Sequence, residues 1–148
     1  MLVALLLGGF IIVLNVVIQA YGNLIWLKRV TPTFQDNGKS YHTKKAWRLL
    51  IVSFLFFTAL HTLQTLIWAL AYVQLPHTSG IFQNFTEAWY YSLVTFTTLG
   101  YGDITLVGDW RILSGIEAIN GIMLIGWTTA MMYSLTQQIL KSLPKKPV

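Results

Sequence analysis

The stretch FTEAWYYSLVTFTTLGYGD, residues 85–103, joins an apolar segment too short to cross a membrane to two closely spaced glycines. Asn84 precedes it and Glu87 follows three residues later, a capping-box pattern that predicts a helix beginning near Phe85. The helix is expected to cover 85–97 and to stop before Gly100 and Gly102. A half-length helix followed by an extended glycine-containing segment predicts a re-entrant loop, which membranes tolerate only where protein or water surrounds it.

Three long stretches on either side of this loop are almost free of charge. Residues 1–27 and 49–75 contain no charged side chain, and 112–140 contain one, Glu117. Each exceeds the roughly 20 apolar residues that cross a hydrocarbon core of about 30 Å. The 148 residues are 10% charged, whereas soluble domains carry about 25%. The predicted fold class is an all-α membrane protein with three transmembrane helices, a re-entrant pore helix and a filter loop.

The basic residues predict the orientation of the chain. Arg111 alone lies between the second and third spans, whereas three lysines follow the last span and six basic residues lie between or beside the first two. Because cytoplasmic loops accumulate Lys and Arg, we expect a multi-pass protein of the plasma or inner membrane with its N-terminus outside and its C-terminus in the cytoplasm. The net charge of +5 also raises nucleic acid as a partner, but so little polar chain argues against it. The six residues are Lys28, Arg29, Lys39, Lys44, Lys45 and Arg48.

The expected organisation has one pore segment per chain and no internal repeat. An extra N-terminal transmembrane helix precedes a basic cytoplasmic loop, a pore module and a short basic tail. The predicted boundaries are 1–28 for the first helix, 29–47 for the loop, 48–140 for the module and 141–148 for the tail. Within the module we expect an outer helix at 48–74, a pore helix at 85–97, a filter at 98–102 and an inner helix at 111–140.

The segment Thr98-Leu99-Gly100-Tyr101-Gly102 has the chemistry of an ion filter. Carbonyl oxygens arranged in successive rings can replace the water shell of K⁺. Glycines at alternate positions make φ > 0 accessible, so that neighbouring carbonyls can point the same way. Thr98 adds a hydroxyl oxygen and the phenol of Tyr101 can brace the filter from behind. A half-helix ending beside the filter also directs about −0.5 charge toward a cation.

Residues 95–103, TFTTLGYGD, resemble the signature of the potassium-channel pore-domain family, and the likeness covers about 48–140. The resemblance implies a homotetramer in membrane lipid, with the filter on the fourfold axis, K⁺ as the permeant ion and no other cofactor. Leu99 stands where Val is commoner, a mild departure because its carbonyl faces the ion. The implied ion-binding residues are Thr98, Leu99, Gly100, Tyr101 and Gly102. We expect Thr97, Asp103 and Glu117 to support the filter.

The resemblance also implies roles along the inner helix. Gly121 matches the hinge glycine, although Gly115 and Gly126 compete. Glu117 is expected to point away from the cavity and to hydrogen-bond behind the filter, to Gln64, Trp68 or the pore helix. The implied residues of the cavity wall and gate are Ile122, Ile125, Thr129, Tyr133 and Gln137.

The first two spans carry polar residues that lipid cannot satisfy. Asn15, Gln19 and Asn23 recur every fourth residue, which predicts a face packed against other helices. His61 in mid-span has two interpretations: a proton sensor or relay, or a neutral imidazole bonded to a neighbouring helix. Trp68, Tyr72 and Trp110 lie near the outer ends of their helices and are expected to form an interfacial aromatic belt.

Two other functions compete with a potassium channel. One is a non-selective cation channel, and the other is a non-conducting membrane subunit that modulates another transporter. The intact Gly-Tyr-Gly argues against both. An enzyme is disfavoured because the sequence contains no metal-ligand constellation, nucleophile elbow or phosphate loop.

Overall fold

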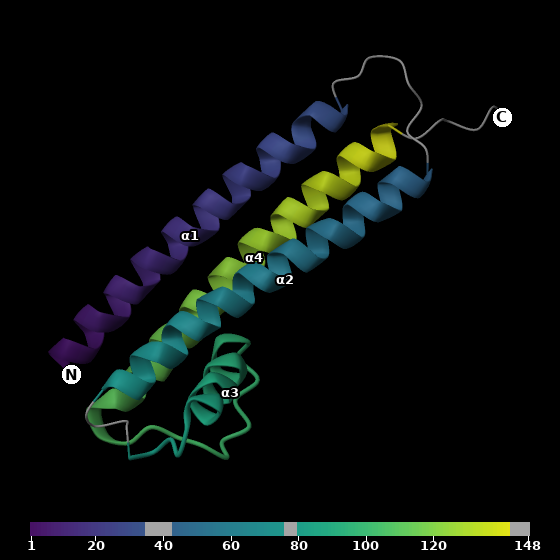
Figure 1. Ribbon diagram of the computed structural model, residues 1–148. Coiled ribbons are helices and arrows are strands. Elements are labelled where there is room, and N and C mark those ends of the chain that lie inside the picture. The colour runs from purple at the N-terminus through teal and green to yellow at the C-terminus, as the bar shows by residue number, and fades with distance from the viewer. Residues whose placement is uncertain (35–42, 76–79, 143–148) are drawn as a thin grey trace.

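The computed structural model describes residues 1–34, 43–75 and 80–142, which form three long helices and one short one (Figure 1). The long helices are α1 (Leu2–Phe34), α2 (Thr43–Gln74) and α4 (Arg111–Ser142), and the short one is α3 (Phe85–Phe96). A 3-10 turn, Gly108–Trp110, leads into α4. The described residues contain no strand, and each long helix is long and apolar enough to cross a membrane. The predicted all-α membrane architecture with three spans is confirmed.

The helices form one bundle with α3 tucked against one end of it. In Figure 1, α2 and α4 run side by side, α1 lies along α4, and α3 packs where α2 ends and α4 begins. The chain between α3 and α4 runs back beside α3 to the start of α4 (Figure 1). The short helix and its following loop are therefore held at one end of the three spans.

The helices extend further than the predicted boundaries. Helices enter the segment expected as a cytoplasmic loop, 29–47, because α1 includes 29–34 and α2 begins at Thr43. At 33 residues α1 is about 50 Å long, well beyond a hydrocarbon core of about 30 Å. Its last turns therefore extend beyond the apolar layer. Polar and basic side chains are solvated there, so they do not prevent the helix from continuing. Residues 35–42, the segment 76–79 and most of the predicted tail, 143–148, lie outside the described residues.

The polar face of α1 is packed inside the bundle, as its spacing predicts. Asn15 and Gln19 are fully buried and Asn23 is 4% exposed. Two glycines allow the neighbouring helices to approach: a Cβ at Gly8 would lie 2.9 Å from Ile116 of α4, and one at Gly22 would lie 2.9 Å from a Leu60 methyl of α2. The first span is thus an integral part of the bundle.

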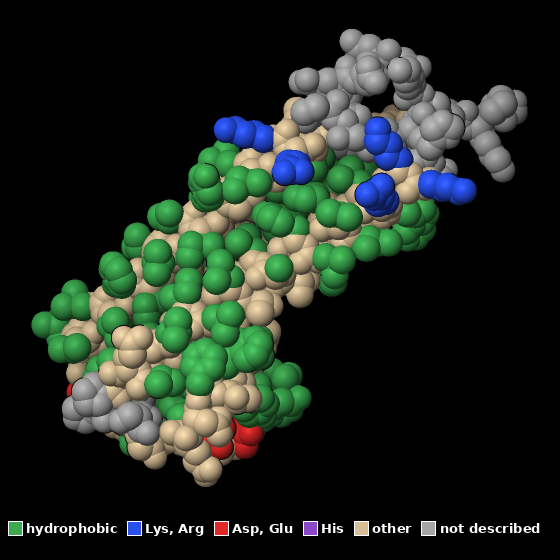
Figure 2. Space-filling view, viewed as in Figure 1, with side chains coloured by type: hydrophobic (Ala, Val, Ile, Leu, Met, Phe, Trp, Pro, Cys, Tyr) green, Lys and Arg blue, Asp and Glu red, His purple; other side chains and the backbone are tan. Residues whose placement is uncertain are grey.

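Charged side chains gather at the two ends of the molecule. Figure 2 shows the visible Lys and Arg side chains at the end where α1 stops and α2 starts, and the visible Asp and Glu side chains at the opposite end. Hydrophobic side chains cover the length between them. This distribution is the one that a protein spanning a bilayer presents to lipid and to water.

Two of the three expected belt aromatics are in the core instead. Trp68 and Tyr72 are both 0% exposed, in the cluster of apolar residues that α2, α3 and α4 share. The prediction of lipid-facing anchors is wrong for these two, because α3 packs against this end of α2 and covers it. Tyr72 stacks edge-on against Tyr91 of α3, with ring centroids 5.2 Å apart.

Candidate functional site

The start of α3 is fixed by its cap. The side chain of Asn84 accepts a hydrogen bond from the backbone N–H of Glu87 at 2.9 Å. Glu87 in turn accepts from the backbone N–H of Gln83 at 2.8 Å, one residue before the position of a standard capping box. The short helix therefore begins at a defined residue, which in turn sets where its other end lies.

The end of α3 is a Schellman motif that delivers the chain directly into the predicted filter. The N–H of Thr98 donates to the carbonyl of Thr95 at 2.9 Å, and the N–H of Leu99 donates to the carbonyl of Val94 at 2.9 Å. Gly100 also donates to Val94, at 3.2 Å. The first filter residues are thus tied to the last turn of the helix.

Backbone conformation alternates along the predicted filter. Thr98, Gly100 and Gly102 have φ values of 60°, 52° and 79°, whereas Leu99 and Tyr101 between them are not in the positive region. In a normal strand successive carbonyls point in opposite directions, and a change in the sign of φ at alternate residues turns them the same way. The two glycines take this conformation without a Cβ penalty, as the sequence predicts.

The sequence did not predict the unusual backbone conformation of Thr98. Among the described residues it is the one non-glycine with positive φ, and a β-branched residue there is strained. The position explains it: Thr98 is the left-handed residue of the Schellman motif, a place usually taken by glycine. Backbone strain of this kind concentrates at functional sites, where the side chain itself is needed.

Two large side chains of the predicted filter segment are exposed. Leu99 is 57% exposed and Tyr101 is 66% exposed, although both are large and apolar enough to be buried. A recess of about 360 Å³ lies beside the segment. Residues of α3 and α4 also line it, namely Tyr91, Thr95, Ser114, Gly115 and Ala118.

Both residues that flank the filter bond back to α3. The hydroxyl of Thr97 donates to the carbonyl of Leu93 at 2.7 Å. The phenol of Tyr90 donates to Asp103 at 2.8 Å, and this hydrogen bond raises the pKa of Tyr90 above its usual value. The segment 98–102 is therefore anchored to the same short helix at both of its ends.

Glu117 is the fully buried carboxylate behind this loop. The Tyr72 hydroxyl of α2 lies 2.5 Å from one carboxylate oxygen and the Ser92 hydroxyl of α3 lies 2.5 Å from the other. Ser92 is also 2.8 Å from the carbonyl of Thr65 in α2. One side chain of α4 thus links the outer helix to the pore helix.

Of the three partners expected for Glu117, the pore helix is the one found. Gln64 bonds to α1 instead, donating to Gln19 at 2.9 Å, and the indole of Trp68 donates to Asn120 at 3.3 Å. Gln64 lies closer to the middle of the bundle than Glu117 does, where it bonds to α1. Tyr72 was missed as a partner because its place near the end of α2 favoured an interfacial position.

Gly121 is the point of closest contact between α4 and the end of α3. A Cβ at this position would lie 1.9 Å from the carbonyl oxygen of Phe96. The competing glycines, Gly115 and Gly126, have no atom within 4 Å of an added Cβ. Gly121 therefore differs from Gly115 and Gly126 in how closely it is packed. This property is separate from the flexibility expected of a hinge glycine.

A comparison with protein families identifies the chain. The family described as "Ion channel" matches residues 48–138, which comprise most of α2, all of α3, the loop and most of α4. The chain belongs to this ion channel family. The match confirms the resemblance to a channel pore domain, whereas no curated protein and no solved structure matches the chain.

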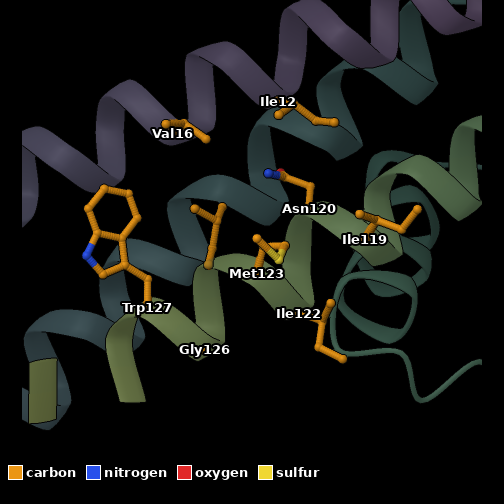
Figure 3. A pocket seen from close by; sticks show the side chains of 9 residues that line it. Ile12, Val16, Ile119, Asn120, Ile122, Met123, Gly126 and Trp127 are labelled. Carbon is orange, nitrogen blue, oxygen red and sulfur yellow. The ribbon is translucent and has the colours of Figure 1, made fainter. Parts of the chain in front are cut away.

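The predicted cavity residues of the channel are distributed along α4. Tyr133 is 66% exposed, Thr129 is exposed with its hydroxyl bonded to the carbonyl of Ile125, and Gln137 is partly buried. Ile125 packs against the core of the chain. Ile122 borders an apolar groove of about 610 Å³ where Ile12 and Val16 of α1 face α4 (Figure 3).

Proposed function

We propose that four copies of this channel assemble around one pore and conduct K⁺ selectively and passively across a membrane. The observation that carries the proposal is the alternation of φ over Thr98, Gly100 and Gly102 within the sequence TLGYG. An alternating backbone presents a column of carbonyl oxygens to one side. Such a column matches the chemistry of a dehydrated K⁺ ion.

The short helix supplies a favourable field for a cation. The C-terminal end of α3, with its free carbonyl groups, lies where the proposed filter begins. A helix C-terminus carries roughly −0.5 elementary charge. No basic side chain among the described residues bonds to this end of α3. An ion that has shed part of its water near the end of α3 is therefore stabilised before it enters the filter.

The number of chains follows from the chemistry of the filter. One chain supplies one carbonyl per level, whereas potassium filters use four loops, one from each subunit. The exposure of Leu99 and Tyr101 supports contacts with further copies, as does the open recess beside them. A non-selective pore is less favoured, because nothing in the described backbone interrupts the alternation.

The proposed topology places the filter end of the bundle outside the cell and the basic end in the cytoplasm. The gathering of Lys and Arg at one end supports this orientation. The N-terminus of α1 lies at the filter end, so it is external in this proposal (Figure 1). A tag at the N-terminus that antibodies reach from outside intact cells supports the topology, and a tag reached only after permeabilisation contradicts it.

The test is ion flux through purified protein in liposomes. K⁺ flux that barium blocks, with much slower Na⁺ flux, is the expected result. Mass measurement in detergent should give four chains per particle. Equal K⁺ and Na⁺ flux contradicts selectivity, and a stable monomer or dimer alone contradicts the assembly.

A matched pair of glycine variants distinguishes a specific effect on the filter backbone from the general cost of adding a Cβ at a positive φ. Gly100 and Gly108 both have positive φ and both have open space around an added Cβ, but Gly108 lies outside the filter. Gly100→Ala should abolish selective K⁺ flux while the protein still inserts. Gly108→Ala carries a similar backbone cost and should remain selective. Unchanged conduction in Gly100→Ala would remove the basis of the proposal.

A further inference from the structure

Four polar side chains in the middle of the bundle form a closed hydrogen-bonded ring, which we call the polar ring. His61 and Gln64 come from α2, Gln19 from α1 and Thr128 from α4. The successive distances are 2.8 Å from His61 to Gln64, 2.9 Å from Gln64 to Gln19, 3.0 Å from Gln19 to Thr128 and 3.0 Å from Thr128 back to His61. The ring therefore joins all three spans.

The chemistry of the members fixes the direction of every bond. Oε1 of Gln64 can only accept, so Nδ1–H of His61 donates to it, and Nε2 of a neutral imidazole is then an acceptor. The amide of Gln64 donates to Gln19, whose amide donates to the Thr128 hydroxyl. That hydroxyl retains its own proton for Nε2 of His61. With His61 neutral, each bond of the ring therefore has one donor and one acceptor.

The groups facing His61 are neutral on every side. Gln64 and Thr128 contact its two nitrogens, and the ring of Phe96 of α3 lies with its centroid 6.0 Å away. On α1 the facing group is Gln19, and Tyr21 nearby is 67% exposed on another face. The buried carboxylate of Glu117 is eleven residues before Thr128, about 16 Å along the helix, and is bonded to other residues.

The remaining titratable groups of these helices lie apart from His61. On α3, Tyr91 precedes Phe96 by five residues and packs against Tyr72. On α2, Tyr72 itself bonds to Glu117. Within the described residues, the two imidazole nitrogens of His61 contact an amide and a hydroxyl, neither of which supplies a counter-charge.

We infer that the polar ring is a proton-operated latch, in which protonation of His61 releases the cytoplasmic half of α4 from α1 and α2. A proton on Nε2 turns that acceptor into a donor, so the Thr128 hydroxyl can no longer donate to it. The hydroxyl can turn to the carbonyl one turn back on its own helix. The new positive charge then stands among neutral groups, an arrangement that is costly unless water reaches it.

The position of Thr128 connects the latch to the pore. Thr128 lies seven residues beyond Gly121, about 10 Å further along α4. Gly121 fixes α4 against the end of α3, so the part of the helix that separates is the part beyond this contact. The conformational inference stands independently of conduction, and only its effect on flux rests on the proposed function.

The test measures a distance first and a flux second. The chain contains no cysteine, so spin labels can be placed at Leu24→Cys of α1 and Leu140→Cys of α4, both exposed positions. The labelled chain is diluted with unlabelled chains in liposomes, and the distance is compared between about pH 8 and about pH 5, across the usual range of histidine titration. Rubidium uptake is measured on the same preparations.

Three variants make the result specific. His61→Gln keeps one donor and one acceptor but cannot take up a proton, and it should remove the change in distance. A double variant of the other two histidines, His42→Gln with His77→Gln, should keep it; both lie outside the described residues. Thr128→Val, which breaks the ring without adding charge, should shift the distances at about pH 8 toward the acid distribution.

The expected result is a pH-dependent distance, accompanied by a several-fold change in uptake, that His61→Gln abolishes. A wild-type distance that does not change overturns the latch, as does a change that persists in His61→Gln or is lost in the double variant. An unchanged wild-type distance overturns the latch even if His61→Gln fails to fold. A distance change without any selective ion uptake supports the latch and contradicts the proposed function.

Discussion

Gly121 of α4 lies so close to the carbonyl oxygen of Phe96 that a Cβ atom at 121 would be 1.9 Å from that oxygen. Phe96 is the last residue of α3, directly before the filter turn. The contact is with backbone, which cannot rotate away as a side chain can. The register between α4 and the proposed filter therefore depends on the absence of a side chain at this position.

Gly121→Ala should displace α3 from α4 and disturb the filter. We expect a loss of about 1–3 kcal/mol or more in the free energy of unfolding, as for other overpacked sites, together with loss of selective flux. Gly126→Ala is the matched control, because no atom lies within 4 Å of its Cβ, and in a helix it should be neutral or stabilising by up to about 1 kcal/mol. Thermal unfolding in detergent and liposome flux measure both effects. Equal behaviour of the two variants would contradict the packing role.

Glu117 should tolerate Gln but not Ala. A Gln amide can donate to Ser92, whose hydroxyl then donates to Thr65, while its oxygen accepts from Tyr72. Glu117→Ala removes the carboxylate that bonds to both Tyr72 and Ser92, at a cost of about 1–3 kcal/mol, and adds a cavity. Thermal stability of the oligomer and the rate of K⁺ flux should fall together in the Ala variant. Wild-type stability and flux in Glu117→Ala would mean that this carboxylate is merely tolerated.

The hydroxyl of Thr98 should matter more than its backbone strain. Thr98→Ser keeps the hydroxyl and should stay selective, whereas Thr98→Val keeps the β-branched shape and should conduct about tenfold less, equivalent to about 1.4 kcal/mol. Thr98→Gly should relieve about 1–2 kcal/mol of strain and unfold at higher temperature, yet lose selectivity. Ion-flux ratios and melting curves on the same preparations separate the two effects. A selective Val variant would show that the hydroxyl is not an ion ligand.

Asn120 should couple α1 to the pore module. Its side-chain oxygen accepts from Asn15 at 3.0 Å and from Trp68 at 3.3 Å, and all three residues are buried. Asn120→Leu should therefore reduce the free energy of unfolding by about 1–3 kcal/mol, because two buried donors lose their acceptor. In a double-mutant cycle with Asn15→Leu, the coupling energy should be about 0.6–1.7 kcal/mol, as for other hydrogen bonds between membrane helices. Strictly additive losses would exclude a direct contribution from this bond.

Much of the fold was predictable because it depends on local sequence. Spans follow from uncharged stretches longer than the bilayer core, the start of α3 from Asn84, and the packed face of α1 from polar residues every fourth position. The positive φ of Gly100 and Gly102 was predictable for the same reason, since glycine is the residue that such a backbone favours.

The rest depends on contacts between residues far apart in the chain. Tyr72 and Glu117 are separated by 45 residues, and nothing local indicates that the phenol reaches the carboxylate. The burial of Trp68 depends on α3 folding back over α2, which periodicity does not reveal. The strained φ of Thr98 comes from where α3 ends, since the motif needs a left-handed residue there whichever side chain occupies it.

The polar face of α1 has a consequence for how the protein is made. Asn15 and Gln19 leave the ribosome long before their partners in α4, from which they are separated by 105 and 109 residues. Until translation has nearly finished, these two amide side chains of the first helix lack those partners, whether in the translocon or in lipid. The first helix to be synthesised is thus the last to complete its contacts, and cellular quality control has a long interval in which to recognise chains that stop short of α4.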